Sequence, residues 1–138
     1  MSEQLKENQT SEAVLIVKPS DLASALPLTE QDAFPEVFAT SRMIALMELA
    51  AARMMQSLLQ EGELSVGVGV NILHTAATTV DEEVRALATF VKQEGKLYHF
   101  NVEVFDKGGS VGKGEHTRAI VSAERLIGSA KKRLNKEL

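Results

Sequence analysis

The chain has 138 residues, of which 44% are hydrophobic and 25% are charged, and its formal net charge is −4 at pH 7. This size and balance are typical of one globular domain with a packed core, and the acidic charge argues against a general nucleic-acid-binding protein. The chain contains no cysteine, which excludes disulfides, thiolate catalysis and cysteine-ligated zinc.

Residues 1–12 are polar and show no hydrophobic periodicity, so we expect a disordered tail in front of a single domain over residues 13–138. This segment lacks the features of a secretory or mitochondrial leader, and no apolar run in the chain is long enough to span a bilayer. We therefore expect a cytoplasmic protein that does not bind membranes.

The first half of the domain contains a strand, a loop and a long helix. Residues 13–17 are an apolar run of strand length, and residues 21–38 contain two prolines and predict a long loop of the kind that often binds ligands. A helix is predicted from Thr40 or Ser41, both good N-cap residues, to about Glu61. Because its interior is apolar on almost every side, we expect this helix to be buried all round.

The second half predicts four strands and a final helix. The strands cover residues 65–75, 84–92, 97–105 and 111–122, and the helix covers residues 123–138. We expect the strands to form an antiparallel meander wrapped around the buried helix, which is an α+β architecture.

Glu48 is the most informative single residue, because it interrupts the apolar helix. An unpaired buried carboxylate costs several kcal/mol, so the side chain must be paired, protonated or used for function. His74 is in phase with Val66 along its strand and is expected to face the helix. A histidine beside a glutamate can act as a general base, although a histidine with a satisfied ring in the core is a common alternative.

Other polar residues have both a structural and a functional interpretation. Thr40 is either the helix N-cap or a hydroxyl placed where the helix N-terminus stabilises an oxyanion. Gly67 either packs against the helix or exposes a backbone N–H to a substrate. His116 and Arg118 could reach an anion, although an exposed arginine on an edge strand is commoner. The basic residues 131–136 are either a solvated helix end or a contact for substrate phosphates. No metal-binding or dinucleotide-binding motif is present, and we expect no metal.

Three segments together resemble one family. They are Phe34-Pro35-Glu36-Val37-Phe38-Ala39-Thr40, Val70-Asn71-Ile72-Leu73-His74-Thr75-Ala76-Ala77-Thr78 and Gly112-Lys113-Gly114-Glu115-His116-Thr117-Arg118. With Glu48, they resemble the fluoroacetyl-CoA thioesterase-like branch of the hot-dog acyl-CoA thioesterases over residues 13–125.

The resemblance implies a hot-dog fold and the hydrolysis of a short acyl-CoA, with or without a substituent, to a free acid and CoA. It implies Thr40, Glu48 and His74 as the catalytic residues. It also places the substrate beside Gly67, Arg118 and a pocket-closing Phe34. Beyond the acyl-CoA substrate no cofactor is implied, and the protein is expected to be a homodimer or a tetramer.

One geometric conflict follows, because eight helical residues rise roughly 12 Å, so Thr40 at the start of a regular helix cannot bond Glu48 directly. We therefore favour a site that lies between two subunits.

Other functions remain open, namely a non-catalytic acyl-CoA-binding or sensing protein, an enoyl-CoA hydratase and a structural dimer. Residues 32–40 lack the histidine that a hot-dog hydratase uses before its helix, which counts against the hydratase.

Overall fold

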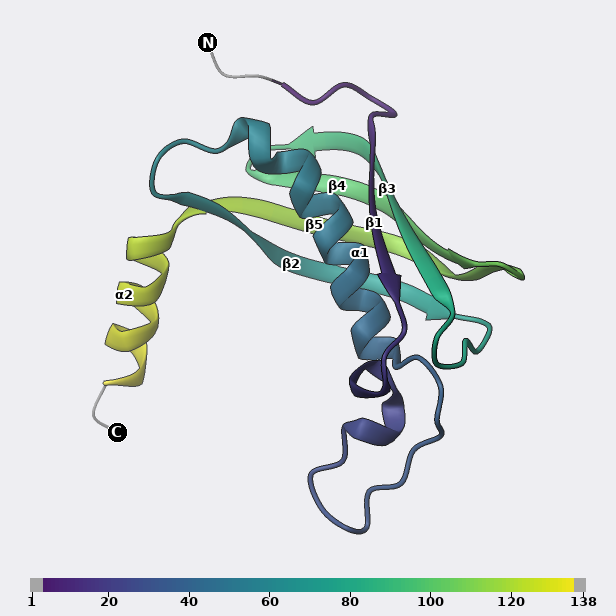
Figure 1. Cartoon of the computed structure of the whole chain (residues 1–138). Helices are drawn as coiled ribbons and strands as arrows, with labels where there is room; N and C mark the ends of the chain where they lie inside the picture. Colours follow the sequence, from purple (N-terminus) through teal and green to yellow (C-terminus); the bar gives the residue numbers. More distant parts are fainter. Residues whose placement is uncertain (1–3, 136–138) are drawn as a thin grey trace.

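The structure is a computed structural model that describes residues 4–135. A five-stranded antiparallel sheet curls around a long helix (Figure 1), with the strands in the order β1-β3-β4-β5-β2. The elements are β1 (Thr10–Ile16), α1 (Thr40–Met55), β2 (Glu63–His74), β3 (Glu83–Glu94), β4 (Leu97–Asp106), β5 (Gly109–Ser122) and α2 (Ala123–Leu134), with short 3-10 turns at Pro19–Asp21, Ala23–Ala25 and Gln56–Leu58. The predicted α+β architecture is confirmed.

The core lies between one face of α1 and the concave side of the sheet. The apolar side chains of α1 that are buried there are Met43, Leu46, Met47, Ala50, Ala51, Met54 and Met55. They pack with buried strand residues that include Val84, Ala86, Phe100, Val102 and Val104. The opposite face of α1 is open, and Leu49 is 44% exposed. The prediction of a helix buried all round is therefore wrong for the single chain, because one sheet covers only one side of it.

Helix α1 is also shorter than predicted. It ends at Met55 and a 3-10 turn follows, so the helical geometry stops before Glu61. The polar residues Gln56, Ser57 and Gln60 are exposed at this end.

The strand order differs from the predicted meander. Only β3, β4 and β5 follow one another, whereas β2 pairs with β5 and forms one edge of the sheet. The other edge is β1, which pairs with β3 from Thr10 onward. Residues 10–12 thus belong to the ladder rather than to a disordered tail, and the amide of Asn8 donates to the carbonyl of Phe90 at 3.0 Å. The first three residues of the expected tail lie outside the described residues.

A β-bulge in β2 changes which residues face the helix. The register between β2 and β5 shifts between Gly67 and Gly69. Directly opposed residues share a face of the sheet, so Gly67, opposite Arg118, is on the same face as His74, opposite Gly112. His74 therefore faces the helix as predicted, but Val66 does not share its face. A regular alternation cannot reveal this extra residue.

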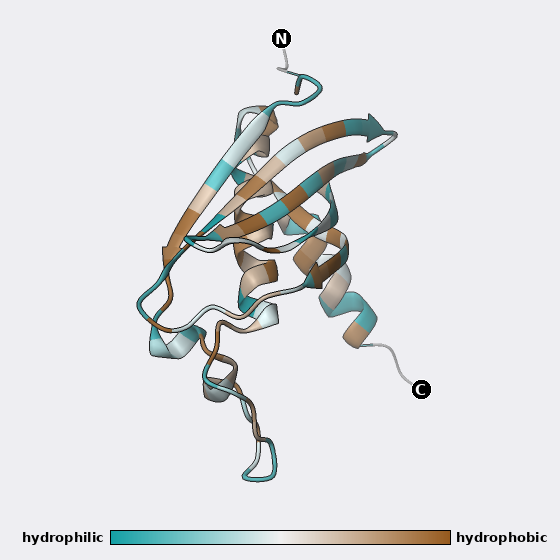
Figure 2. Cartoon of the chain, turned by 90° about the vertical axis from the view of Figure 1, so that its right-hand side faces the viewer, coloured by the Kyte–Doolittle hydropathy of each residue, from teal (hydrophilic) through white to brown (hydrophobic). Residues whose placement is uncertain are grey.

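The loop before α1 is held at its base and projects beyond the sheet. The amides of Ala23 and Ser24 donate to the carbonyls of Val37 and Pro35. Figure 2 shows this loop extending away from the sheet with a hydrophilic tip. No helix within residues 4–135 is long and apolar enough to cross a bilayer.

Candidate active site

A cleft of about 390 Å³ opens where the loop before α1, the first turn of α1 and the end of β2 meet. Most of its lining is apolar, and the lining residues are Ala23, Pro35, Val37, Phe38, Ala39, Thr40, His74, Thr75, Ala76 and Ala77. The cleft can therefore accept a small apolar group beside the polar side chains of Thr40, His74 and Thr75.

Thr40 and His74 form a direct hydrogen bond in this cleft. The distance between Thr40 Oγ1 and His74 Nδ1 is 2.7 Å. Thr40 is the first residue of α1, whereas the N-cap position is Ala39, which has no side-chain capping bond. The hydroxyl of Thr40 is thus directed to His74 and is not the helix cap. It also lies at the positive end of the helix dipole.

His74 is suited to accept a proton. Burial lowers its pKa, and the nearby backbone of Ala76 opposes this effect. The ring is therefore neutral at pH 7. In the tautomer that carries its proton on Nε2, Nδ1 accepts the hydrogen of the Thr40 hydroxyl. Nε2 itself is buried and has no hydrogen-bond partner within the described part of the chain.

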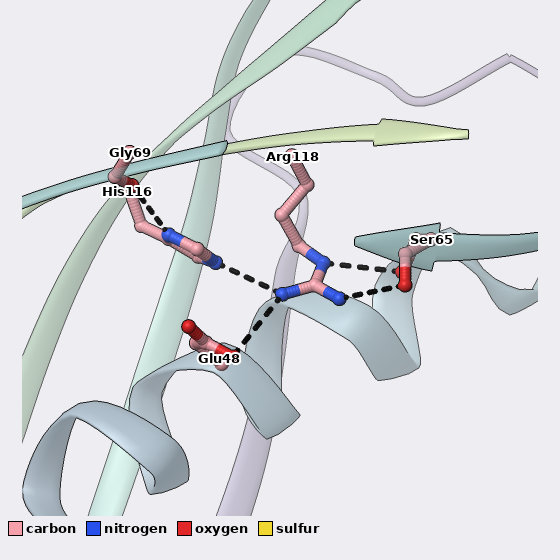
Figure 3. A network of polar contacts seen from close by, with 5 residues as sticks. All are labelled: Glu48, Ser65, Gly69, His116 and Arg118. Atoms are coloured by element: carbon pink, nitrogen blue, oxygen red, sulfur yellow. Dashed lines mark hydrogen bonds and ion pairs between the residues drawn. The ribbon is translucent and has the colours of Figure 1, made fainter. Parts of the chain in front are cut away.

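Glu48 lies two turns further along α1, in a second cluster that also contains Ser65, His116 and Arg118, here called the Glu48 cluster. Its side chain is 41% exposed, and its Oε2 lies 3.8 Å from Nη1 of Arg118 (Figure 3). The prediction that Glu48 is buried and pairs with His74 is therefore wrong within one chain. The physical reason is the separation of eight residues from Thr40, which is roughly 12 Å along a helix.

Arg118 and His116 are buried, contrary to the expectation of an exposed arginine. They are 5% and 2% exposed, because β5 is an interior strand and both side chains face α1. Arg118 Nε donates to Oγ of Ser65 at 3.1 Å and Nη2 donates to the carbonyl of Ser65 at 3.0 Å. No local pattern points to Ser65 as the partner of Arg118, since the two residues are 53 positions apart.

Gly67 lies directly against the Glu48 cluster. A Cβ at this position would be 3.0 Å from Oε1 of Glu48 and 3.3 Å from Cε1 of His116. Gly67 is therefore next to Glu48, a predicted catalytic residue. Because glycine has no side chain, the carboxylate can come close to the strand here.

Two other predicted contacts lie away from the cleft. Phe34 is 51% exposed and does not line the cleft, although its neighbour Pro35 does. Lys131, Lys132 and Arg133 are exposed in the last turn of α2. Lys136, the last of the basic residues, is outside the described residues. No group of three or more histidine, aspartate or glutamate side chains within residues 4–135 could hold a metal ion.

Comparison with known proteins identifies relatives of the same fold and length. The profile of a family described as "Fluoroacetyl-CoA-specific thioesterase" matches residues 17–124. A fluoroacetyl-CoA thioesterase from Streptantibioticus cattleyicolor is 39% identical over 93 residues, which are 67% of this chain and 67% of that protein.

Solved structures agree with this match. A structure of a fluoroacetyl-CoA thioesterase is 30% identical and superposes with a TM-score of 0.85, covering 98% of this chain and 100% of the other. A thioesterase superfamily member from Thermus thermophilus is 27% identical, also with a TM-score of 0.85, over 97% of this chain and 98% of the other.

Proposed function

Because the chain belongs to the fluoroacetyl-CoA-specific thioesterase family, we propose that it hydrolyses the thioester of a short acyl-CoA, substituted or not, to a free acid and CoA. The observation that carries this proposal is the 2.7 Å bond between Thr40 Oγ1 and His74 Nδ1 inside an apolar cleft. A hydroxyl bonded to a neutral imidazole is an arrangement that activates a nucleophile.

In the proposed reaction, His74 removes a proton from the nucleophile, which is the Thr40 hydroxyl or a water held beside it. The nucleophile attacks the thioester carbonyl, and the carbonyl oxygen becomes an oxyanion. Amide groups of the first turn of α1 have no intrahelical partner and are placed to stabilise that charge. The C–S bond then breaks, and the protonated His74 returns its proton to the CoA sulfur. With water as the nucleophile this step releases the free acid. With Thr40 it leaves an ester on Oγ1, and a water deprotonated by His74 then hydrolyses this ester to the free acid and the restored hydroxyl.

We further propose that the protein is a homodimer formed through β2. This strand is an edge of the sheet, and an unpaired edge favours pairing with another strand. It also carries apolar side chains that are 41–68% exposed, namely Leu64, Val68, Val70 and Leu73.

This dimer would bring the two clusters together. If β2 pairs antiparallel with its copy about Asn71, the bulge between Gly67 and Gly69 places Gly67 opposite the partner's His74. Glu48 lies against Gly67, so its carboxylate would complete the site of the partner. Glu48 of one subunit would then act with Thr40 and His74 of the other.

The activity is tested with a panel of acyl-CoAs from acetyl to long-chain, monitored by release of free thiol. We expect turnover of the short acyl-CoAs and its loss in His74→Ala. Tight binding of acyl-CoA without thiol release would contradict the enzyme and favour an acyl-CoA-binding protein instead.

The shared site is tested by mixing two variants whose activity we expect to be strongly reduced but measurable, Glu48→Gln and His74→Ala. In a mixed dimer one site would contain both intact residues, so random subunit exchange should restore about a quarter of the wild-type activity. No recovery after verified exchange would show that each site uses the residues of one chain.

The proposed reaction consumes only the acyl-CoA and water, so we propose no cofactor beyond the CoA of the substrate. We also propose that the protein acts in the cytoplasm, where acyl-CoA is available.

A further inference from the structure

His116 is the least exposed member of the Glu48 cluster, at 2% exposure, and it has no role in the steps proposed above. Its Nδ1 lies 2.8 Å from the carbonyl oxygen of Gly69, and its Nε2 lies 3.1 Å from Nη1 of Arg118 (Figure 3). Both ring nitrogens therefore form hydrogen bonds, Nδ1 with the bulge of β2 and Nε2 with Arg118.

These two contacts fix the state of the ring. A carbonyl oxygen can only accept, so Nδ1 carries the proton and donates it to Gly69. Nε2 is then unprotonated and accepts from Nη1 of Arg118. Burial lowers the pKa of His116, which agrees with a neutral ring beside the arginine cation.

The contacts of Arg118 link the neutral ring of His116 to Glu48. Nε and Nη2 are both bonded to Ser65, and Nη1 is bonded to His116. The carboxylate of Glu48 is 3.8 Å from Nη1, beyond hydrogen-bond distance, so it is held by charge. The position of the Arg118 guanidinium in front of Glu48 therefore depends on its neutral partners, Ser65 and His116. His116 is bonded to Nη1, which is also the nitrogen that faces the Glu48 carboxylate.

We infer that His116 is a positioning residue, which holds Arg118 in place and through it the carboxylate of Glu48. This inference rests on the proposed thioester hydrolysis, in which Glu48 takes part.

Two substitutions separate the two contacts of His116. The amide of asparagine overlies the position of Nδ1 and can keep the bond to Gly69, whereas the amide of glutamine reaches the position of Nε2 and can accept from Arg118. We expect His116→Asn to lower kcat by about ten- to a hundredfold with a small change in KM, and His116→Gln to keep most of the activity. His99→Asn is the matched control, since His99 lies on the neighbouring strand with Glu94 as its charged partner, and it should keep full activity.

A double-mutant cycle tests whether His116 acts through Glu48. In a Glu48→Gln background, His116→Asn should cause no further loss of kcat. A loss as large as in the wild-type background would overturn the inference, and so would equal losses in His116→Asn and His116→Gln.

A crystal structure of His116→Asn gives a readout that does not depend on activity. We expect Nη1 of Arg118 to move away from Glu48, and an unchanged pair would overturn the inference. If the wild-type protein releases thiol from none of the acyl-CoAs, the proposed function fails, while this structure still decides whether His116 holds Arg118.

Discussion

Replacing Thr40 with valine tests the contact on which the proposed function depends. Valine keeps the shape and the β-branch of threonine but removes the hydroxyl that lies 2.7 Å from Nδ1 of His74. Thr40 is exposed and does not cap α1, so the folded state loses only this hydrogen bond. We expect a loss of stability of about 0.5–1.5 kcal/mol at most.

The expected loss of activity is much larger than the loss of stability. A positioned proton acceptor contributes about 10²- to 10⁴-fold to the rate, and Thr40→Val removes the hydroxyl through which His74 acts. At about 1.36 kcal/mol for each factor of ten, this is about 2.7–5.4 kcal/mol of transition-state stabilisation. A loss of transition-state stabilisation that clearly exceeds the loss of folding stability identifies Thr40 as a reacting group and not a structural one.

Thiol release from acetyl-CoA provides the assay, and because the chain contains no cysteine, a thiol reagent reports only the product. Thr40→Ser retains the hydroxyl and is the matched control, which we expect to keep most of the wild-type kcat/KM. If Thr40→Val is as active as Thr40→Ser while His74→Ala is inactive, the hydroxyl plays no part in the reaction and the reasoning is wrong.

Three further predictions follow from single positions. Burial lowers the pKa of His74, so kcat/KM should be level from pH 7 to 8 and fall only below about pH 6.5, and a fall that begins above this pH would contradict a neutral base. Gly67→Ala adds a methyl group 3.0 Å from Oε1 of Glu48, a flexible group, so kcat should fall while the melting temperature changes little. Gly114→Ala would drive its methyl group into the backbone of β2, whereas at Gly112 the nearest atoms belong to the flexible side chain of Met43, so thermal unfolding should show a much larger destabilisation for Gly114→Ala.

The strands were predictable because the signals that define them are local. A strand pattern that is apolar on both faces at residues 84–92, and apolar strand patterns bounded by turns at residues 94–96 and 106–109, predicted β3, β4 and β5 within a few residues of their observed bounds. The position of β2 in the sheet was not predictable in the same way. It pairs with β5, and nothing in the local pattern of a strand specifies a partner about 50 residues away.

The candidate site was predictable in its residues but not in its contacts. Thr40 and His74 are 34 positions apart and meet because the first turn of α1 lies beside the end of β2. The burial of Arg118 had no local signal, since a charged residue on a strand is usually exposed. Of its three neutral contacts, two come from Ser65 on β2 and one comes from His116 on β5 itself.

The main error of the sequence interpretation, a buried Glu48, has the same cause as the open face of α1. The apolar residues of α1 predict burial on every side of the helix. In a single chain only the side that faces the sheet is covered. Leu49 on α1 is 44% exposed and Leu73 on β2 is 68% exposed. The half-exposed Glu48 directly precedes Leu49 in the sequence. A second copy paired along β2 would cover this region. The proposed dimer thus explains why an apolar helix is left partly open, and why a carboxylate on that helix lies two turns from the histidine of its own chain.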